Sequence, residues 1–266
     1  MAFAARQASG GSLIRRSMST AVRIGEAMVV IPIMVGLGWV NWAAATWLRY
    51  GHQRAPGIGD ALLDPFIPRY EVSDRQERIV DAPAATVFKA IESFRMEDSR
   101  IIRVLIGARG RILRAPRGAP IAPRPFLDVI RSIGWGTLVE VPGREFIFGA
   151  VTQPWKAEVL FRPLTPARFA AFDADGYARI AWTIAVDSLG PRRSRVRTET
   201  RVATTDPDSR ERFRRYWAFF SPGISLIRYA ALRAIGTAAE HESATPATPV
   251  VPPITLVVAN SGGIRS

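Results

Sequence analysis

The chain has 266 residues, of which 48% are hydrophobic and 22% are charged, which excludes a wholly disordered protein and allows one substantial core. It contains no cysteine, and its two histidines are His52 and His241. Disulfides, thiolate metal sites and thiol nucleophiles are therefore excluded, and zinc enzymes and histidine triads are disfavoured. We expect no cofactor and no metal.

The formal net charge is +13, and every basic residue except Lys89 and Lys156 is an arginine. The arginines are scattered from Arg6 to Arg265, without the interleaved aromatic residues that stack on bases. This pattern indicates an arginine-rich composition, and we expect no specific nucleic-acid partner.

Residues 27–48 contain no charged side chain, and about 20 apolar residues suffice to cross a bilayer. We expect a single-pass membrane anchor within residues 26–50. A signal peptide cleaved before secretion and a buried soluble helix are the alternatives. More arginines precede the segment than directly follow it, which favours an extracytoplasmic position for the folded domain.

The rest of the chain divides by composition. Residues 1–25 are predicted to be a disordered basic tail, and residues 51–66, rich in glycine and proline, a linker. Residues 242–266 are rich in proline, alanine and threonine and are predicted to be a second disordered tail. The folded domain is then expected over residues 67–241, which is the size of a single domain.

The first half of this domain is predicted to begin with a strand over residues 70–80. Asp81 and Pro83 are favourable helix-start residues, and the apolar residues that follow them recur at helical spacing. A short amphipathic helix is therefore expected after the strand. Residues 103–124 are basic and rich in glycine and proline, and they are predicted to form a mobile loop.

Antiparallel strands are predicted next. Residues 135–141 and 145–151 form a hairpin around Pro142-Gly143, with Thr137, Val139 and Val141 expected on one face. Further strands are predicted over residues 157–162, 177–187 and 194–204. Short connections favour a meander.

A long helix is predicted from Asp206-Pro207 to about Glu240. Its aromatic residues Phe213, Tyr216, Trp217 and Phe220 recur at helical spacing. Pro222-Gly223 is expected to break or kink it, so we predict two parts. Its apolar stripe is typical of a helix that covers a sheet.

This order of elements resembles the helix-grip superfamily of START-like and polyketide-cyclase-like (SRPBCC) domains. The resemblance rests on YEVSDRQERIVDAPAATVFKAI, GWGTLVEVPGREFIFGAVTQPW and TETRVATTDPDSRERFRRYWAFFSPGISLIRYAALRAI, which lie within residues 67–240. It implies an α+β fold, in which a curved antiparallel sheet grips the C-terminal helix around an apolar cavity. The superfamily includes lipid carriers, receptors and cyclases, so the resemblance leaves the activity open.

Candidate ligand-binding residues are the large amphipathic side chains that could wall such a cavity, together with one cation: Trp155, Trp182, Arg201, Tyr216 and Trp217. Glu145 and Glu199 are the candidate catalytic carboxylates. The alternative for Glu145 is a solvated turn position, and the alternative for Glu199 is a surface or cross-strand ion pair. If their face of the sheet lined the cavity, they could act as acid or base.

A membrane-tethered binding or carrier domain for a hydrophobic small molecule or lipid is the function that these features favour. A cyclase or lyase-like enzyme, and a module that binds anionic lipid or protein through the basic loop, remain open as alternatives. No catalytic constellation is found, so a non-enzymatic role is preferred. The sequence predicts no oligomeric state.

Overall fold

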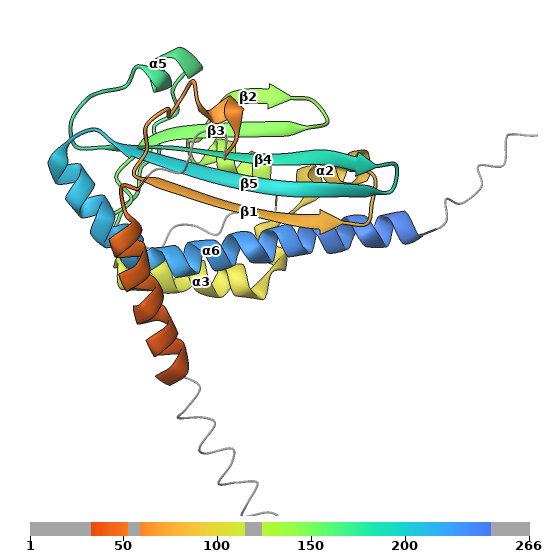
Figure 1. Ribbon diagram of the computed structural model, residues 1–266, viewed down its shortest axis with the longest axis horizontal. Helices are drawn as coiled ribbons and strands as arrows, with labels where there is room; N and C mark the ends of the chain where they lie inside the picture. The colour runs from red at the N-terminus through yellow and green to blue at the C-terminus, as the bar shows by residue number, and fades with distance from the viewer. Residues whose placement is uncertain (1–32, 53–58, 115–123, 246–266) are drawn as a thin grey trace, which may run out of the picture.

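A five-stranded antiparallel sheet forms the centre of the molecule in a computed structural model that describes residues 33–52, 59–114 and 124–245 (Figure 1). The strands lie in the order β1-β5-β4-β3-β2. Their bounds are β1 Val72–Val80, β2 Gly136–Val141, β3 Glu145–Thr152, β4 Ala178–Gly190 and β5 Arg193–Thr204. β1 pairs with the last strand, from Val72 opposite Val202 to Val80 opposite Ser194.

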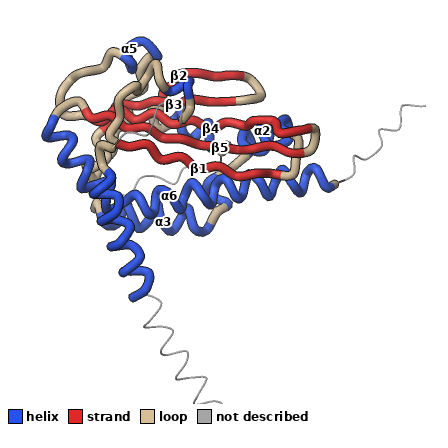
Figure 2. Tube along the Cα trace, viewed as in Figure 1, coloured by secondary structure: helices blue, strands red, loops and turns tan. Residues whose placement is uncertain are grey.

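The helices are unequal in length and lie mainly on one side of the sheet (Figures 1 and 2). They are α2 Ala84–Ser93, α3 Arg100–Ile112, α4 Phe126–Ser132, α5 Pro166–Ala170 and α6 Pro207–Ala244, with 3-10 turns η1 Ala61–Leu63 and η2 Met96–Asp98. An N-terminal helical segment covers residues 33–49. α6 runs along the sheet with α3 beside it, and the N-terminal segment extends away from the sheet.

The start of α6 follows from its sequence, and Pro222 lies inside the helix without ending it. Asp206 caps its start, because the carboxylate accepts a hydrogen bond from the backbone N–H of Ser209 at 2.8 Å, and Pro207 occupies the first turn. Of the break or kink predicted at Pro222-Gly223, the break is not found, because the helix continues through Pro222 to Ala244. Figure 1 shows the axis of α6 changing direction along its length, as an internal proline favours.

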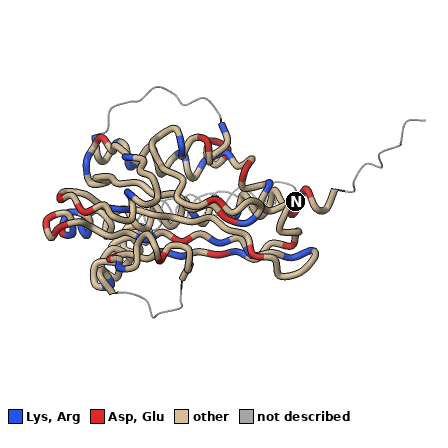
Figure 3. Tube along the Cα trace, turned by 90° about the horizontal axis from the view of Figure 1, so that it is seen from above, with Lys and Arg blue, Asp and Glu red and all other residues tan. Residues whose placement is uncertain are grey.

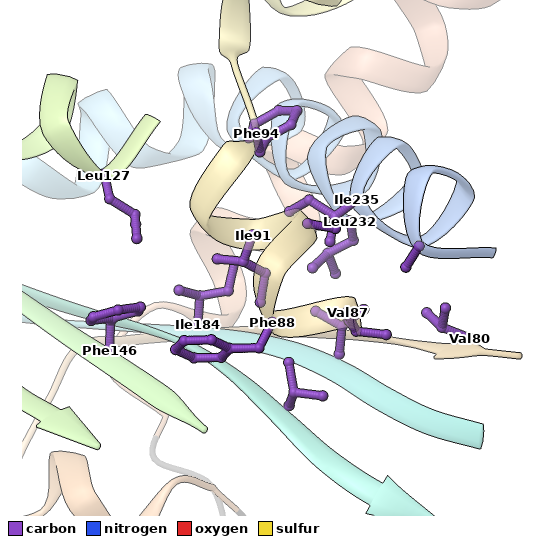
Figure 4. Close-up of a cluster of buried hydrophobic side chains, with 14 of the residues drawn as sticks. Val80, Val87, Phe88, Ile91, Phe94, Leu127, Phe146, Ile184, Leu232 and Ile235 are labelled. Carbon is purple, nitrogen blue, oxygen red and sulfur yellow. The ribbon is translucent and has the colours of Figure 1, made fainter. Parts of the chain in front are cut away.

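One core lies between the sheet and the helices (Figure 4). Phe88 of α2 stacks on Phe146 of β3, with ring centroids 5.3 Å apart, and Ile91 and Ile235 are buried in the same core. Alternation along each strand sends every second side chain into this core.

A second, smaller core covers the opposite face of the sheet, which we call the outer face. Leu63 of η1, Ile67 and Phe169 of α5 are completely buried there against Ile147 of β3. Residues 59–67, which we call the outer strap, therefore belong to the packed structure, although they fall largely within the predicted linker.

Other expectations fail for local reasons. Residues 103–112 of the predicted mobile loop lie in α3, because Ser99 caps this helix and Ile102 anchors it in the core; residues 115–123 lie outside the described residues. Residues 157–162 form no strand and contribute one isolated bridge, between Val151 and Arg162. A register shift between Thr137 and Val139 puts these two side chains on different faces.

The terminal predictions are only partly covered by the described residues. The predicted basic tail lies outside them, as do residues 246–266 of the second tail and residues 27–32 of the predicted membrane segment. Among the helices of the described ranges, none combines the length and hydropathy required to cross a membrane. Figure 3 shows basic and acidic residues interspersed along the chain.

Candidate functional site

An apolar cavity of about 370 Å³ lies between the sheet and the helices α3, α4 and α6. β4 contributes Trp182 and Ile184 to its wall, and α6 contributes Ile227 and Ala231. These residues share one face of their elements, because side chains alternate along a strand and recur every three to four residues along a helix. The cavity volume lies within the range of small-molecule sites.

Aromatic rings surround Trp182 and fix its position. Its ring stacks on that of Phe148 with centroids 5.0 Å apart, and the edge of Trp135 meets it at 6.2 Å. Phe126 of α4 lies 5.7 Å from it on the helical side. The wall thus offers flat, weakly polar surfaces on which an apolar ligand can pack.

The sheet also brings hydroxyl groups to this apolar wall. Thr200 of β5 lies opposite Trp182 of β4 in the strand register, and Thr198 lies opposite Ile184. Both threonines line the cavity. A hydroxyl both donates and accepts hydrogen bonds, so these two positions can hold one polar group of a ligand.

Two arginines border the cavity on the helical side. Arg228 of α6 donates to the Asp74 carboxylate at 2.9 Å and to the Asp74 carbonyl oxygen at 3.0 Å. Burial lowers the pKa of Arg228 from its usual range, and the Asp74 carboxylate acts in the opposite direction. Arg109 of α3 donates to the Tyr216 hydroxyl at 3.4 Å and to the Pro154 carbonyl oxygen at 3.2 Å.

The structure separates the predicted ligand-binding residues. Trp182, Tyr216 and Trp217 line the cavity. Trp155 packs beside the cluster of Val72, Val202 and Phe213 and is not part of the cavity wall. Arg201 points to the outer face of the sheet, because it alternates with Thr200 and Val202 along β5. Whether the three lining residues bind a ligand stays a prediction.

The predicted catalytic carboxylates also lie on the outer face. Glu145 is completely buried, so the solvated turn position is not found. Glu199 is 1% exposed and lies 3.7 Å from Arg75, its partner in the register of β1, so a cross-strand ion pair is found, buried and not on the surface. Neither carboxylate lines the cavity. The outer strap covers both side chains, and the condition for assigning them acid or base chemistry in the cavity is not met.

The outer strap and β5 form a buried ionic network. Arg197 donates to Glu145 at 3.3 Å and to Asp187 at 2.9 Å, and it also pairs with Asp60 of the strap. The other half of the network is centred on Arg201, which donates to Glu199 at 2.9 Å and to Asp64 at 2.6 Å. The backbone N–H of Asp60 donates to Glu199 at 2.8 Å and links the two halves.

Protons in this network are distributed unequally. Burial, together with the neighbouring Asp60, raises the pKa of Glu145 to about 7, although the Thr183 hydroxyl donates to this carboxylate at 2.6 Å. Burial acts in the same direction on Asp60, but hydrogen bonds with Glu145 and Arg197 hold the pKa of Asp60 below its usual value. Of these two acids, Glu145 is therefore the one that is protonated more readily.

Sequence reasoning missed the polar groups of the cavity and named Trp182, Tyr216 and Trp217 of its apolar wall. The alternation of Thr198 and Thr200 with the charged residues of β5 was visible in the sequence and indicated their face. Arg228 interrupts the apolar stripe between Ile227 and Ala231, and this interruption was the available signal. Arg109 could not be found, because its helix was expected to be a loop.

No protein-family model matches the chain, and no curated protein matches its sequence. Among solved structures, it is similar to norcoclaurine synthase from Thalictrum flavum in complex with dopamine and hydroxybenzaldehyde, at 14% identity and a TM-score of 0.31; the match covers 73% of this chain and 99% of that chain. It is also similar to the Zhui aromatase/cyclase from Streptomyces sp. R1128, at 15% identity and a TM-score of 0.27, covering 64% of this chain and 94% of that chain.

A hypothetical protein from Helicobacter pylori is similar at 10% identity and a TM-score of 0.33, covering 70% of this chain and 98% of that chain. These values carry no activity over to this chain. The architecture itself, an antiparallel sheet against a long C-terminal helix with the cavity between them, is the α+β helix-grip fold. The fold that the sequence resemblance implies is thus confirmed.

Proposed function

We propose that this domain binds a hydrophobic small molecule or lipid in the cavity between the sheet and α6, as a binding or carrier protein. The observation that carries the proposal is the apolar cavity of about 370 Å³ with Trp182 at its wall. An empty apolar cavity of this size costs stability, which an apolar ligand restores by burying its own surface.

The polar groups at the cavity indicate what kind of ligand fits. Thr198 and Thr200 supply hydroxyls from the sheet, and Arg228 and Arg109 supply cationic donors from the helices. Arginine donates and cannot accept, so the ligand carries at least one acceptor, such as a carbonyl, hydroxyl or carboxylate oxygen. The rest of its surface is apolar.

Native mass spectrometry of the purified full chain tests the proposal. We expect an added mass that organic solvent removes and whose identity gives the ligand class. Replacing Ala231, which lines the cavity, by tryptophan should fill the space and abolish the added mass. Ala238→Trp makes the same change on an exposed position of the same helix and should leave the added mass intact. A native chain without bound mass that also fails to bind an apolar fluorescent probe would overturn the proposal.

The membrane tether is the second part of the proposed function. Its support is the apolar surface of the N-terminal helical segment, where Met34, Val35 and Val40 are each more than 60% exposed. Another side of the same segment is attached to α6, because Trp39 donates to the Phe219 carbonyl oxygen at 3.0 Å and Arg214 lies 4.0 Å from the centroid of the Trp47 ring. We infer that residues 27–48 hold the domain at a membrane, on its extracytoplasmic side.

Deleting residues 1–38 tests the tether while it preserves Trp39, Trp47 and Tyr50 on α6. We expect the full chain to remain in the membrane fraction after a high-salt wash and the shortened chain to be soluble with an unchanged circular dichroism spectrum. A full chain found in the soluble fraction, with its N-terminus removed by cleavage, would instead support secretion. Protease added to intact cells reports the side on which the domain lies.

A further inference from the structure

We propose that α3 and the adjoining surface of α6 form a docking face for a bilayer that contains anionic lipids. This docking face consists of Arg100, Arg103, Val104 and Arg111 of α3, with Leu226 and Tyr229 of α6. The proposal goes beyond ligand binding in the cavity and does not depend on it.

α3 presents apolar and basic side chains to solvent together. Val104 is 69% exposed and Ile101 is 50% exposed, whereas Ile102 is completely buried and holds the helix on the domain. Arg100, Arg103 and Arg111 are exposed on the same helix, and no acidic residue occurs between Arg100 and Arg114. A helix with this combination lies in the interface of a membrane, with its apolar side chains among the lipids and its arginines at the headgroups.

The exposed surface of α6 continues this apolar face. Leu226 is 42% exposed and Tyr229 is 55% exposed. Both line a groove together with Ile101 of α3 and Arg233 of α6. Asp98 and Arg95 lie at the same groove and form an exposed ion pair at 3.6 Å, so the one acidic side chain there has a local basic partner.

The N-terminal helical segment joins the docking face at one point. A Cβ placed on Gly223 of α6 would contact the Trp39 ring at 3.4 Å and the Leu105 side chain at 3.9 Å, so the segment, α6 and α3 meet around this glycine. Exposed apolar side chains lie on both sides of Trp39 in the segment, among them Leu37 before it and Val40 directly after it. The apolar surface is therefore continuous from the segment to α3, which favours a lipid surface over a separate protein partner.

Charge complementarity selects the kind of lipid. Each arginine near an anionic membrane surface contributes favourably to the free energy of binding, and this contribution falls as salt screens the charges. Arg109 of α3 also borders the cavity. Docking of α3 would thus bring one wall of the cavity to the headgroup region, from which a lipid could enter.

A single label on α3 tests the proposal, because the chain contains no cysteine. The full chain carrying Val104→Cys is labelled with an environment-sensitive fluorophore and reconstituted into vesicles of phosphatidylcholine with phosphatidylglycerol. We expect a blue-shifted emission that spin-labelled lipids quench. Ala167→Cys, on the exposed surface of α5, is the control, and a label there should show the emission of a fluorophore in water.

Removing charge from α3 is the second arm. Arg100→Gln, Arg103→Gln and Arg111→Gln together should lower the ratio of docked to undocked α3 by on the order of tenfold or more. The matched variant Arg144→Gln, Arg168→Gln and Arg192→Gln removes the same charge from exposed positions on other elements and should leave the ratio unchanged. Ligand mass, measured on the same samples, should remain unchanged in both.

Three outcomes would overturn the proposal. One is a label on residue 104 that stays in water although the chain is bound to vesicles. Another is equal quenching in phosphatidylcholine alone, which would remove the role of anionic lipid. The third is a blue shift that appears without vesicles and grows with protein concentration, which would assign the docking face to a second copy of this chain.

Discussion

The two faces of the sheet carry the alternate side chains of the same strands, yet they are packed in different ways. On β5, Thr198 and Thr200 line an open apolar cavity, whereas Arg197, Glu199 and Arg201 are sealed beneath the outer strap. Charges are tolerated in the sealed face because each one has several partners. Polar composition alone therefore does not mark the face with the cavity, and the more hydrophobic side of the sheet is the one that retains space.

The largest expected effect comes from breaking the sealed face. Arg197→Met keeps most of the side-chain volume but leaves Glu145 and Asp60 without their cation. We expect the free energy of unfolding to fall by about 3–5 kcal/mol in urea denaturation. Arg193→Met, on the same strand, removes one half of an exposed pair with Asp81 at 3.8 Å and should change it by less than about 0.5 kcal/mol. Equal effects would show that the network is not buried in solution.

The proton on Glu145 makes the sealed face sensitive to pH. The pKa of this carboxyl is raised from 4.5 to about 7 in the folded protein, so the folded state binds more protons than the unfolded state between these values. Stability contributed by Glu145 is therefore lost as the pH rises from about 5 to about 7, with a slope of at most about 1.4 kcal/mol per pH unit.

Denaturation at a series of pH values measures this slope. Glu145→Gln keeps an acceptor for the Thr183 hydroxyl and cannot ionise, so its stability should change less over the same range. An identical slope in the variant would place the titration elsewhere.

A Thr→Val substitution on each face of the sheet compares the two faces directly, and it has the smallest expected effect on stability. Thr183→Val removes a hydroxyl that donates to buried Glu145, and it should cost about 1–3 kcal/mol. Thr200→Val removes a hydroxyl that faces the cavity, and it should change stability by less than about 1 kcal/mol while it weakens ligand binding severalfold. A larger stability loss at Thr200 than at Thr183 would contradict the division between the faces.

Much of the structure on the helix-covered face of the sheet could be predicted, because the sequence patterns that indicate it are local. The alternation around Trp182 and the helical spacing of Phe213, Tyr216 and Trp217 set the correct strands, helix and facing side chains. The α3 helix was missed because Gly107 and Gly110 weakened its local signal, while burial of Ile102 stabilises it in the structure. The outer strap was missed for a different reason: its contacts join residues far apart in the chain, and no local pattern reports them.

The outer strap contacts residues of β5 that lie far from it in the sequence, and this separation affects the order in which the structure folds. Asp60 and Asp64 are each 137 residues before their partners, Arg197 and Arg201, and β1 also pairs with β5. Long loops must close before these contacts form, and such closure slows folding. During synthesis, the strap and β1 have to wait for the last strand. We therefore expect the edge of the sheet at β1 and the charged interior of the outer face to form together, late, in one kinetic step.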